Sequence, residues 1–84
     1  MLLNISQLID RIRDSYNVIQ SSIYGDGENL ILKVEKKHFA VCVGSSGVTV
    51  YETFQESSGD WIFLTSSKTG KSLKTVDNFI QSRI

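Results

Sequence analysis

The stretch FLTSSKTGKSL, residues 63–73, contains a Gly-Lys-Ser triplet between a strand-like and a helix-like run, which is the setting of a nucleotide-binding loop. Such a loop also needs a glycine five residues before the Gly-Lys pair, because its backbone amides wrap closely around phosphates. Thr65 stands there instead, and the twelve residues after Ser72 are too few for a second strand with a magnesium-binding aspartate. We therefore expect no nucleotide site. We expect a strand-to-helix loop over 66–71, with Thr69 or Ser72 as the helix cap and Gly70 at the turn.

Three lysines, Lys68, Lys71 and Lys74, surround the start of this predicted helix, where the helix dipole disfavours cations. Two interpretations stay open. The lysines belong to a solvated loop, or they hold an anion such as a nucleic-acid phosphate together with free backbone amides. The charge is uneven along the chain: residues 68–84 carry four basic side chains and one acidic one, a net of +3, whereas residues 44–67 carry three acidic and no basic ones, a net of −3.

His38 and Cys42 are the single histidine and the single cysteine, so the chain lacks the ligands of an ordinary zinc site. Both fall on one face of a predicted strand, but roughly 13 Å apart, which is too far for a catalytic dyad. No two carboxylates are spaced for acid–base chemistry. We therefore expect no catalytic residue, no metal, no cofactor and no enzyme activity.

Tyrosines and acids lie near two predicted turns, and we expect them to form a protein-binding surface. Tyrosine offers contact area with little loss of side-chain entropy, and a turn on a rigid hairpin presents it well. The candidate binding residues are Tyr24, Asp26, Glu28, Tyr51, Glu52, Glu56 and Asp60. The alternative is that the acids are turn residues that only keep the protein soluble.

Two amphipathic helices and five strands must position these residues. Helical periodicity predicts a helix over 4–15, with Asn4 as N-cap and with Leu3 packing on Leu8 as a hydrophobic staple, and a second helix over 72–83. Between the helices the hydrophobic period changes to two, and turn residues, most of them glycine-bearing, separate the segments. Strands are predicted at 17–24, 29–35, 38–43, 48–54 and 60–65.

Short turns between these strands predict antiparallel neighbours, and both helices need a surface on which to bury their apolar stripes. The fold class is therefore α+β: one domain over residues 1–84, a two-layer sandwich with an antiparallel meander of about five strands and both helices on one face. The expected core is Leu30, Leu32, Val34, Phe39, Val41, Val43, Val48 and Val50, and Trp61 is assigned to the core rather than to an interface. The opposite face carries Ile31, Ala40, Cys42 and Tyr51 with no helix left to cover it, so we expect a homodimer or a partner on this open face.

The composition weighs against several classes of protein. Nine basic side chains balance nine acidic ones, which weakens the case for bulk electrostatic binding to nucleic acid. No apolar run approaches the ~20 residues that cross a membrane, so we expect no membrane association. The first residues lack the basic region of a signal peptide, and a single cysteine cannot form an internal disulfide. We therefore expect a cytoplasmic protein.

The first half of the chain has the pattern Asn4-Ile5-x-x-Leu8-Ile9-x-x-Ile12, then Tyr16-x-Val18, then Leu30-Ile31-Leu32-Lys33-Val34. This helix followed by a hairpin resembles the opening of small phage-encoded anti-CRISPR proteins that inhibit Cas9. The resemblance implies a small, non-catalytic inhibitor of a larger host defence protein. Those inhibitors are strongly acidic DNA mimics, whereas this chain is neutral, so the resemblance assigns no binding residue. The alternative function is a nucleic-acid-binding accessory that uses Lys68, Lys71 and Lys74.

Overall fold

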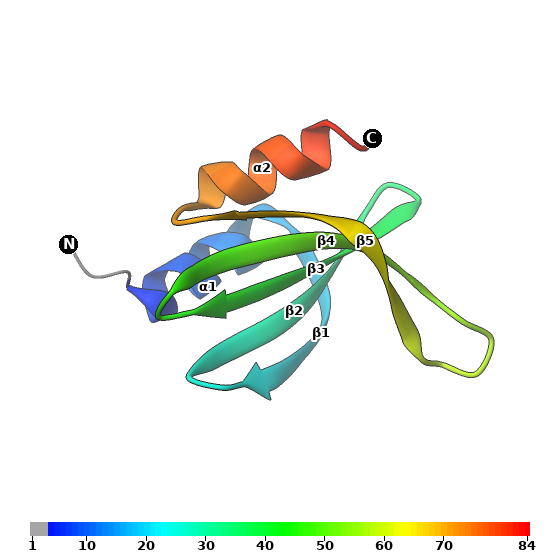
Figure 1. Cartoon of the computed structure of the whole chain (residues 1–84), viewed down its shortest axis with the longest axis horizontal. Coiled ribbons are helices and arrows are strands. Elements are labelled where there is room, and N and C mark those ends of the chain that lie inside the picture. Colours follow the sequence, from blue (N-terminus) through cyan, green and yellow to red (C-terminus); the bar gives the residue numbers. More distant parts are fainter. Residues whose placement is uncertain (1–3) are drawn as a thin grey trace.

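The computed structural model describes residues 4–84 and shows an α+β fold of two helices and one five-stranded sheet (Figure 1). The elements in chain order are α1 (Ile5–Ser15), β1 (Asn17–Tyr24), β2 (Gly27–Val34), β3 (Lys37–Gly44), β4 (Gly47–Gln55), β5 (Trp61–Gly70) and α2 (Leu73–Gln81). The strands pair in sequence order, each antiparallel to the next. The predicted fold class, strand order and number of elements are confirmed.

The element boundaries agree with the prediction within about two residues, with one exception. The predicted strand 60–65 and the predicted loop 66–71 are together one strand, because β5 continues to Gly70. Residues 67–70 pair with β4 along Val48–Tyr51. The expected strand-to-helix loop is therefore wrong, and only Lys71 and Ser72 connect β5 to α2. A run of small hydroxyl residues indicates a loop from local propensity, but pairing with a neighbouring strand decides otherwise.

Helix α1 begins as its sequence predicts. The side chain of Asn4 accepts a hydrogen bond from the backbone amide of Gln7 at 3.0 Å, which satisfies one of the free amides of the first turn. The helix ends at Tyr16, whose extended backbone leads directly into β1. The staple predicted between Leu3 and Leu8 falls outside the described residues, because the description begins at residue 4.

Helix α2 begins at Leu73, and its N-cap is Ser72, the second of the two caps that the sequence left open, although the Ser72 side chain makes no capping hydrogen bond. Gly70 is required here by close packing. A Cβ atom at this position would lie 2.0 Å from the side-chain oxygen of Thr75 in the first turn of α2. Gly70 therefore lets the helix fold back tightly onto the strand that it follows.

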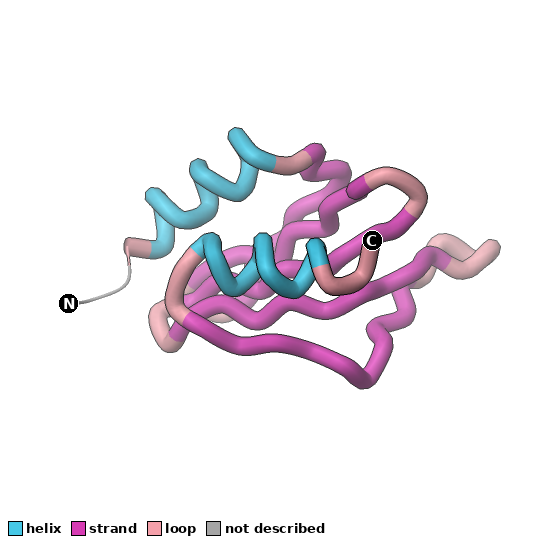
Figure 2. Tube along the Cα trace, turned by 90° about the horizontal axis from the view of Figure 1, so that it is seen from above, coloured by secondary structure: helices cyan, strands magenta, loops and turns pink. Residues whose placement is uncertain are grey.

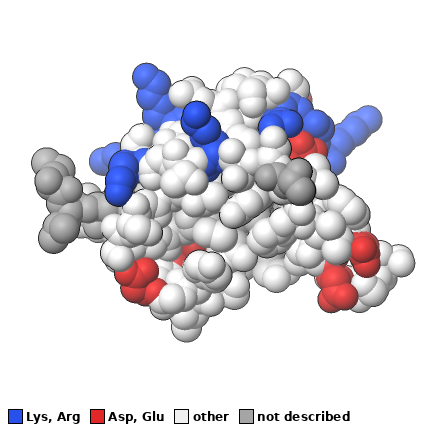
Figure 3. Space-filling model, viewed as in Figure 1, with Lys and Arg blue, Asp and Glu red and all other residues white. Residues whose placement is uncertain are grey.

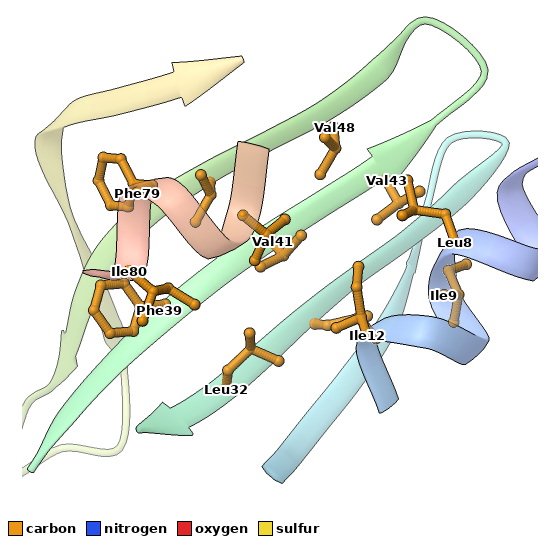
Figure 4. Close-up of a cluster of buried hydrophobic side chains, with 13 residues drawn as sticks. Leu8, Ile9, Ile12, Leu32, Phe39, Val41, Val43, Val48, Phe79 and Ile80 are labelled. Atoms are coloured by element: carbon orange, nitrogen blue, oxygen red, sulfur yellow. The ribbon is translucent and has the colours of Figure 1, made fainter. Parts of the chain in front are cut away.

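Both helices lie on the same face of the sheet, as Figures 1 and 2 show from two directions. Helix α1 packs on β1 and β3, and α2 packs on β4 and β5. Figure 4 shows their apolar side chains meeting those of the strands between the two layers. The core consists of Leu8, Ile9, Ile12, Leu30, Leu32, Phe39, Val41, Val43, Val48, Val50, Val76, Phe79 and Ile80. Seven of the eight strand residues predicted for the core belong to it, and Val34 packs at its margin.

A hydrogen bond joins the two helical segments at the edge of this core. The hydroxyl of Tyr16, at the end of α1, donates to the carboxylate of Asp77 in α2. Burial, the hydrogen bond to Asp77 and the negative charge of Asp77 together raise the pKa of the Tyr16 phenol. The bond therefore requires the neutral phenol.

Neither of the two described helices is long and apolar enough to cross a membrane.

We predict that Tyr16→Phe lowers the free energy of unfolding at neutral pH by about 1–2 kcal/mol, because Asp77 loses a donor near the core. Since the folded state raises the pKa of Tyr16, its stabilising effect is complete below the unfolded value of about 10 and is lost as the pH rises above it. The difference between wild type and variant should therefore narrow above pH 10. Urea unfolding from pH 7 to 11 measures this, with Tyr24→Phe as an exposed control. A difference that stayed constant across this range would contradict the assignment.

Candidate functional site

The face of the sheet opposite the helices, called the second sheet face below, is shaped by a bend in β5. Tyr51 of β4 pairs with Ser67 and Thr53 pairs with Phe63, so three residues of β5, 64–66, oppose the single residue Glu52. Extra residues in one strand bend it and increase its twist. Figure 1 shows the result: the first half of β5 and the β4–β5 turn leave the plane of the sheet and bend away from α2.

This bend places Trp61 over the second sheet face. The indole nitrogen of Trp61 donates to the side-chain oxygen of Gln20 at 3.2 Å, which connects β5 with β1, the two opposite edge strands. The ring of Trp61 also meets His38 edge to face, with centroids 5.1 Å apart. Ile31 and Ala40 are consequently buried although no helix covers them. The expected open face is therefore partly covered by its own chain, and these two residues are not accessible to a partner.

An aromatic pair remains accessible beside this covered part. The rings of Tyr51 and Phe63 stack with centroids 5.5 Å apart and planes inclined by 28°. Phe63 is 42% exposed, and Tyr24, on the β1–β2 hairpin, is 61% exposed. An aromatic residue on a sheet surface that is only half covered offers contact area with little entropy to lose.

Tyr24 and Tyr51 line one pocket of about 290 Å³ between the β1–β2 and β3–β4 turns. Its walls are formed by Tyr24, Gly25, Asp26, Cys42, Val43, Gly44, Ser46, Gly47, Thr49, Tyr51 and Thr69. Asp26 is the single charged residue in this lining. Hydrogen bonds from Ser45, whose amide lies 3.3 Å from both carboxylate oxygens, hold the pKa of Asp26 below its usual value. The pocket therefore combines two aromatic rings and hydroxyl groups with one fixed negative charge.

The two acidic hairpins predicted as a binding surface lie at opposite ends of the sheet, yet on the same side. In a meander, successive turns lie at opposite ends of the sheet, so Asp26 in the first turn belongs to one end and Glu56 and Asp60 at the fourth turn belong to the other. Figure 1 shows both hairpin tips pointing away from α2. Figure 3 shows acidic side chains at the lower left and lower right of this view and most basic ones along the upper side. The second sheet face thus has an acid-bearing hairpin at each end.

Two of the seven predicted binding residues do not belong to this face. Glu28 accepts a hydrogen bond from Arg13 of α1 at 3.1 Å, and Glu52 lies 3.6 Å from the ammonium of Lys37. Successive residues of a strand point to opposite faces, so Glu52 cannot share the face of its neighbour Tyr51. Both acids therefore serve ion pairs on the helical side of the sheet.

Phe63 and Trp61 are the important residues of this site that sequence reasoning missed. Trp61 was expected in the core on the helical side, but its partner in the sheet is Gln55, and it lies half buried over the second sheet face. The alternation of Trp61 and Phe63 shows that they share a face. It does not show which face, because the face depends on how β5 pairs with β4, where Trp61 lies opposite Gln55 and Phe63 opposite Thr53.

The lysines of the alternative site are exposed around the junction of β5 and α2. Lys68 lies opposite Val50, hence on the helical side of the sheet, and Lys74 lies in the first turn of α2. The ammonium of Lys71 donates to the backbone oxygen of Ser46 at 2.7 Å. The backbone before Lys71 belongs to an antiparallel ladder rather than to a loop that could surround a phosphate.

The single cysteine and histidine do not form a reactive pair in the structure. The thiol of Cys42 donates to the side-chain oxygen of Asn29 at 3.6 Å, and burial raises its pKa, so the thiol stays protonated. Among residues 4–84, no three His, Cys, Asp or Glu side chains are grouped to hold a metal ion.

Comparisons of the chain with family models, with curated proteins and with solved structures find no match. The resemblance to Cas9 inhibitors therefore stays a prediction. The function is therefore inferred from the geometry of the second sheet face.

We predict that ATP or GTP with magnesium gives no heat of binding in isothermal calorimetry, because the Gly70-Lys71-Ser72 triplet ends a strand instead of forming a phosphate loop. Lys71→Ala should change the free energy of unfolding by no more than about 0.5 kcal/mol, as expected of an exposed side chain. Micromolar affinity for either nucleotide that Lys71→Ala abolished would show that this interpretation is wrong.

Proposed function

We propose that this protein is a small, non-enzymatic binding module whose second sheet face recognises a larger partner protein. The observation that carries the proposal is the stacked pair Tyr51–Phe63 beside the exposed Tyr24, on a face that neither α1 nor α2 covers. Apolar side chains that gather in one accessible patch mark contact sites more often than scattered ones do. Such side chains supply the buried centre of many protein interfaces.

The arrangement of these aromatics suits an interface that forms without a large loss of entropy. Tyr51 and Phe63 come from neighbouring strands, and each ring restricts the other. Trp61, fixed by Gln20 and His38, supports the hairpin from which Phe63 projects. A surface held rigid before binding retains more of its contact energy as affinity.

The charges around this face indicate the chemistry of the partner. Asp26 at one end and Glu56 and Asp60 at the other bear negative charge, and the aromatic residues lie between them. Complementary charge at the margin of an interface speeds association and favours the correct partner. We therefore infer a partner surface that is apolar at its centre and basic at its margin, with an apolar or cationic side chain entering the pocket between Tyr24 and Tyr51.

The inhibitory role proposed for this module rests on the N-terminal resemblance to anti-CRISPR proteins. A chain of 84 residues can inhibit a larger defence protein by occupying the surface that its substrate needs. The proposed setting is the cytoplasm of a cell that carries a phage or another mobile element. The fold supports this role only indirectly, by presenting one binding face on a rigid sheet.

The exposed lysines at the junction of β5 and α2 support a second candidate, a nucleic-acid-binding accessory protein. Lys68, Lys71 and Lys74 lie close together along the chain, and none is placed in an ion pair in the described structure. Lys68 faces the side opposite the aromatic residues, which leaves no stacking surface beside it. Binding there would depend on phosphate contacts alone. It would weaken steeply with salt, whereas an interface with an aromatic centre would not.

We predict that a photo-crosslinking amino acid at Phe63 captures one partner, whereas the same amino acid at the exposed Gln81 of α2 does not. With the captured protein purified, Tyr24→Ala should weaken binding by about 2 kcal/mol, or roughly thirtyfold, because it removes an anchor of the pocket. Phe54→Ala is the matched control, since Phe54 is an exposed aromatic residue whose side chain lies on the helical side of β4. Calorimetry at two salt concentrations measures both effects.

The opposite pattern would reject the proposal. Equal affinity of wild type and Tyr24→Ala, together with loss of binding on replacing Lys68 and Lys74 by glutamate, would transfer the function to the lysines. A salt dependence that corresponds to several released counterions would then identify nucleic acid as the ligand.

A further inference from the structure

Strand β1 is an edge strand that contains a bulge at Ile19 and then pairs regularly with β2 along Gln20–Tyr24. The sheet order places it beside β2 alone. Its sequence, NVIQSSIY, contains neither a charged residue nor a proline. The regular stretch after the bulge, Gln20–Tyr24, has the length of a common short strand and can pair with another one. A neutral edge strand of this length is a template for pairing with a further strand.

The side chains of β1 are as accessible as its backbone. Seven of its eight residues are exposed, and Val18 is the half-buried exception. Ile23 is 89% exposed and Ile19 is 45% exposed, although β-branched apolar residues are the ones that pair best across strands. Within residues 4–84 no segment covers this edge.

The other edge of the sheet is protected by contrast. Strand β5 bends sharply at residues 64–66, so it offers no long straight row of backbone groups. Lys68 adds a positive charge to its second half, and Gly70 ends the strand directly before α2. Irregular pairing and a charge are devices by which natural sheets prevent edge pairing; β1 has one extra residue instead of two, and it has no charge. The difference between the edges singles out β1.

We propose that β1 pairs antiparallel with β1 of a second copy of this chain, which joins the two sheets into one. The occupant follows from charge: a strand without charged residues meets its own copy with no like charges opposite one another. Helix α1 lies next to this edge, and its exposed charges, Asp10, Asp14, Arg11 and Arg13, sum to zero. Two copies can therefore approach without net repulsion.

The pairing would form a closed dimer rather than a fibre. Strand β1 of each copy is used up in the contact, and the protected β5 strands become the two outer edges. A twofold axis between antiparallel strands runs perpendicular to the sheet, so both second sheet faces point in the same direction. The inference does not depend on the proposed function, but if both hold, one dimer presents two binding faces side by side.

Sedimentation equilibrium over a range of concentrations tests the dimer. Ile23→Lys should raise its dissociation constant at least about tenfold, equivalent to about 1.4 kcal/mol, because pairing of Gln20–Tyr24 centred on Ser22 makes the two ammonium groups diagonal neighbours on one face. Ile84→Lys is the matched control, since it makes the same change at an exposed isoleucine away from β1, and it should leave the constant unchanged. Mixing the Ile23→Lys and Ile23→Glu variants should restore dimers that neither forms alone.

Hydrogen exchange gives an independent readout. The amides of residues 20–24 that face away from β2 should become protected as the concentration of the wild type rises, and those of β5 should not. A wild type that is monomeric at all concentrations would overturn the proposal. So would a dimer that Ile23→Lys leaves intact, including one that Tyr51→Ala disrupts, which would locate the contact on the second sheet face.

Discussion

The two extra residues that β5 inserts opposite Glu52 determine how this small sheet is arranged. They allow the two halves of β5 to contribute to opposite faces of the sheet. The second half of β5 stays in the sheet and delivers α2 onto the core, with Gly70 packed closely against Thr75. The first half bends away and brings Trp61 over the opposite face. Ile31 and Ala40 are buried on this face without a helix over them, so the bent part of β5 takes the place of a third layer.

The two faces of the sheet consequently differ in kind. The helical face is sealed by apolar contacts between helices and strands, and the hydrogen bond from Tyr16 to Asp77 joins its two helical segments. The opposite face has a small covered region under Trp61 and an accessible aromatic pair beside it, Tyr51 and Phe63. A domain of 84 residues can bury only a limited part of its surface, so what it leaves accessible is informative about its contacts.

The two edges differ for a related physical reason. The bend that covers the second sheet face also removes β5 as a pairing edge, because its backbone groups no longer lie in one line. Strand β1 has a smaller irregularity, a bulge at Ile19, pairs regularly along Gln20–Tyr24 and carries no charge. If β1 pairs with its copy and the aromatic face binds a partner, the two contacts use different surfaces and do not compete. The two extra residues in β5 would then affect both contacts, because the bend shapes the second sheet face and leaves β1 as the edge that can pair.

The sequence by itself determined the elements and the core. Hydrophobic periods of 3.6 and 2 are local properties, so they identified both helices, the five-stranded meander and the buried face that includes Val41 and Val50. Only the tertiary structure decided which exposed residues share a surface. It brought Tyr24 and Tyr51 to one pocket, placed Glu28 in an ion pair on the far side, and extended β5 through the predicted loop. These outcomes depend on strand register and on a bend whose position is set by pairing with β4, and pairing between distant residues leaves no periodic signal in a single sequence.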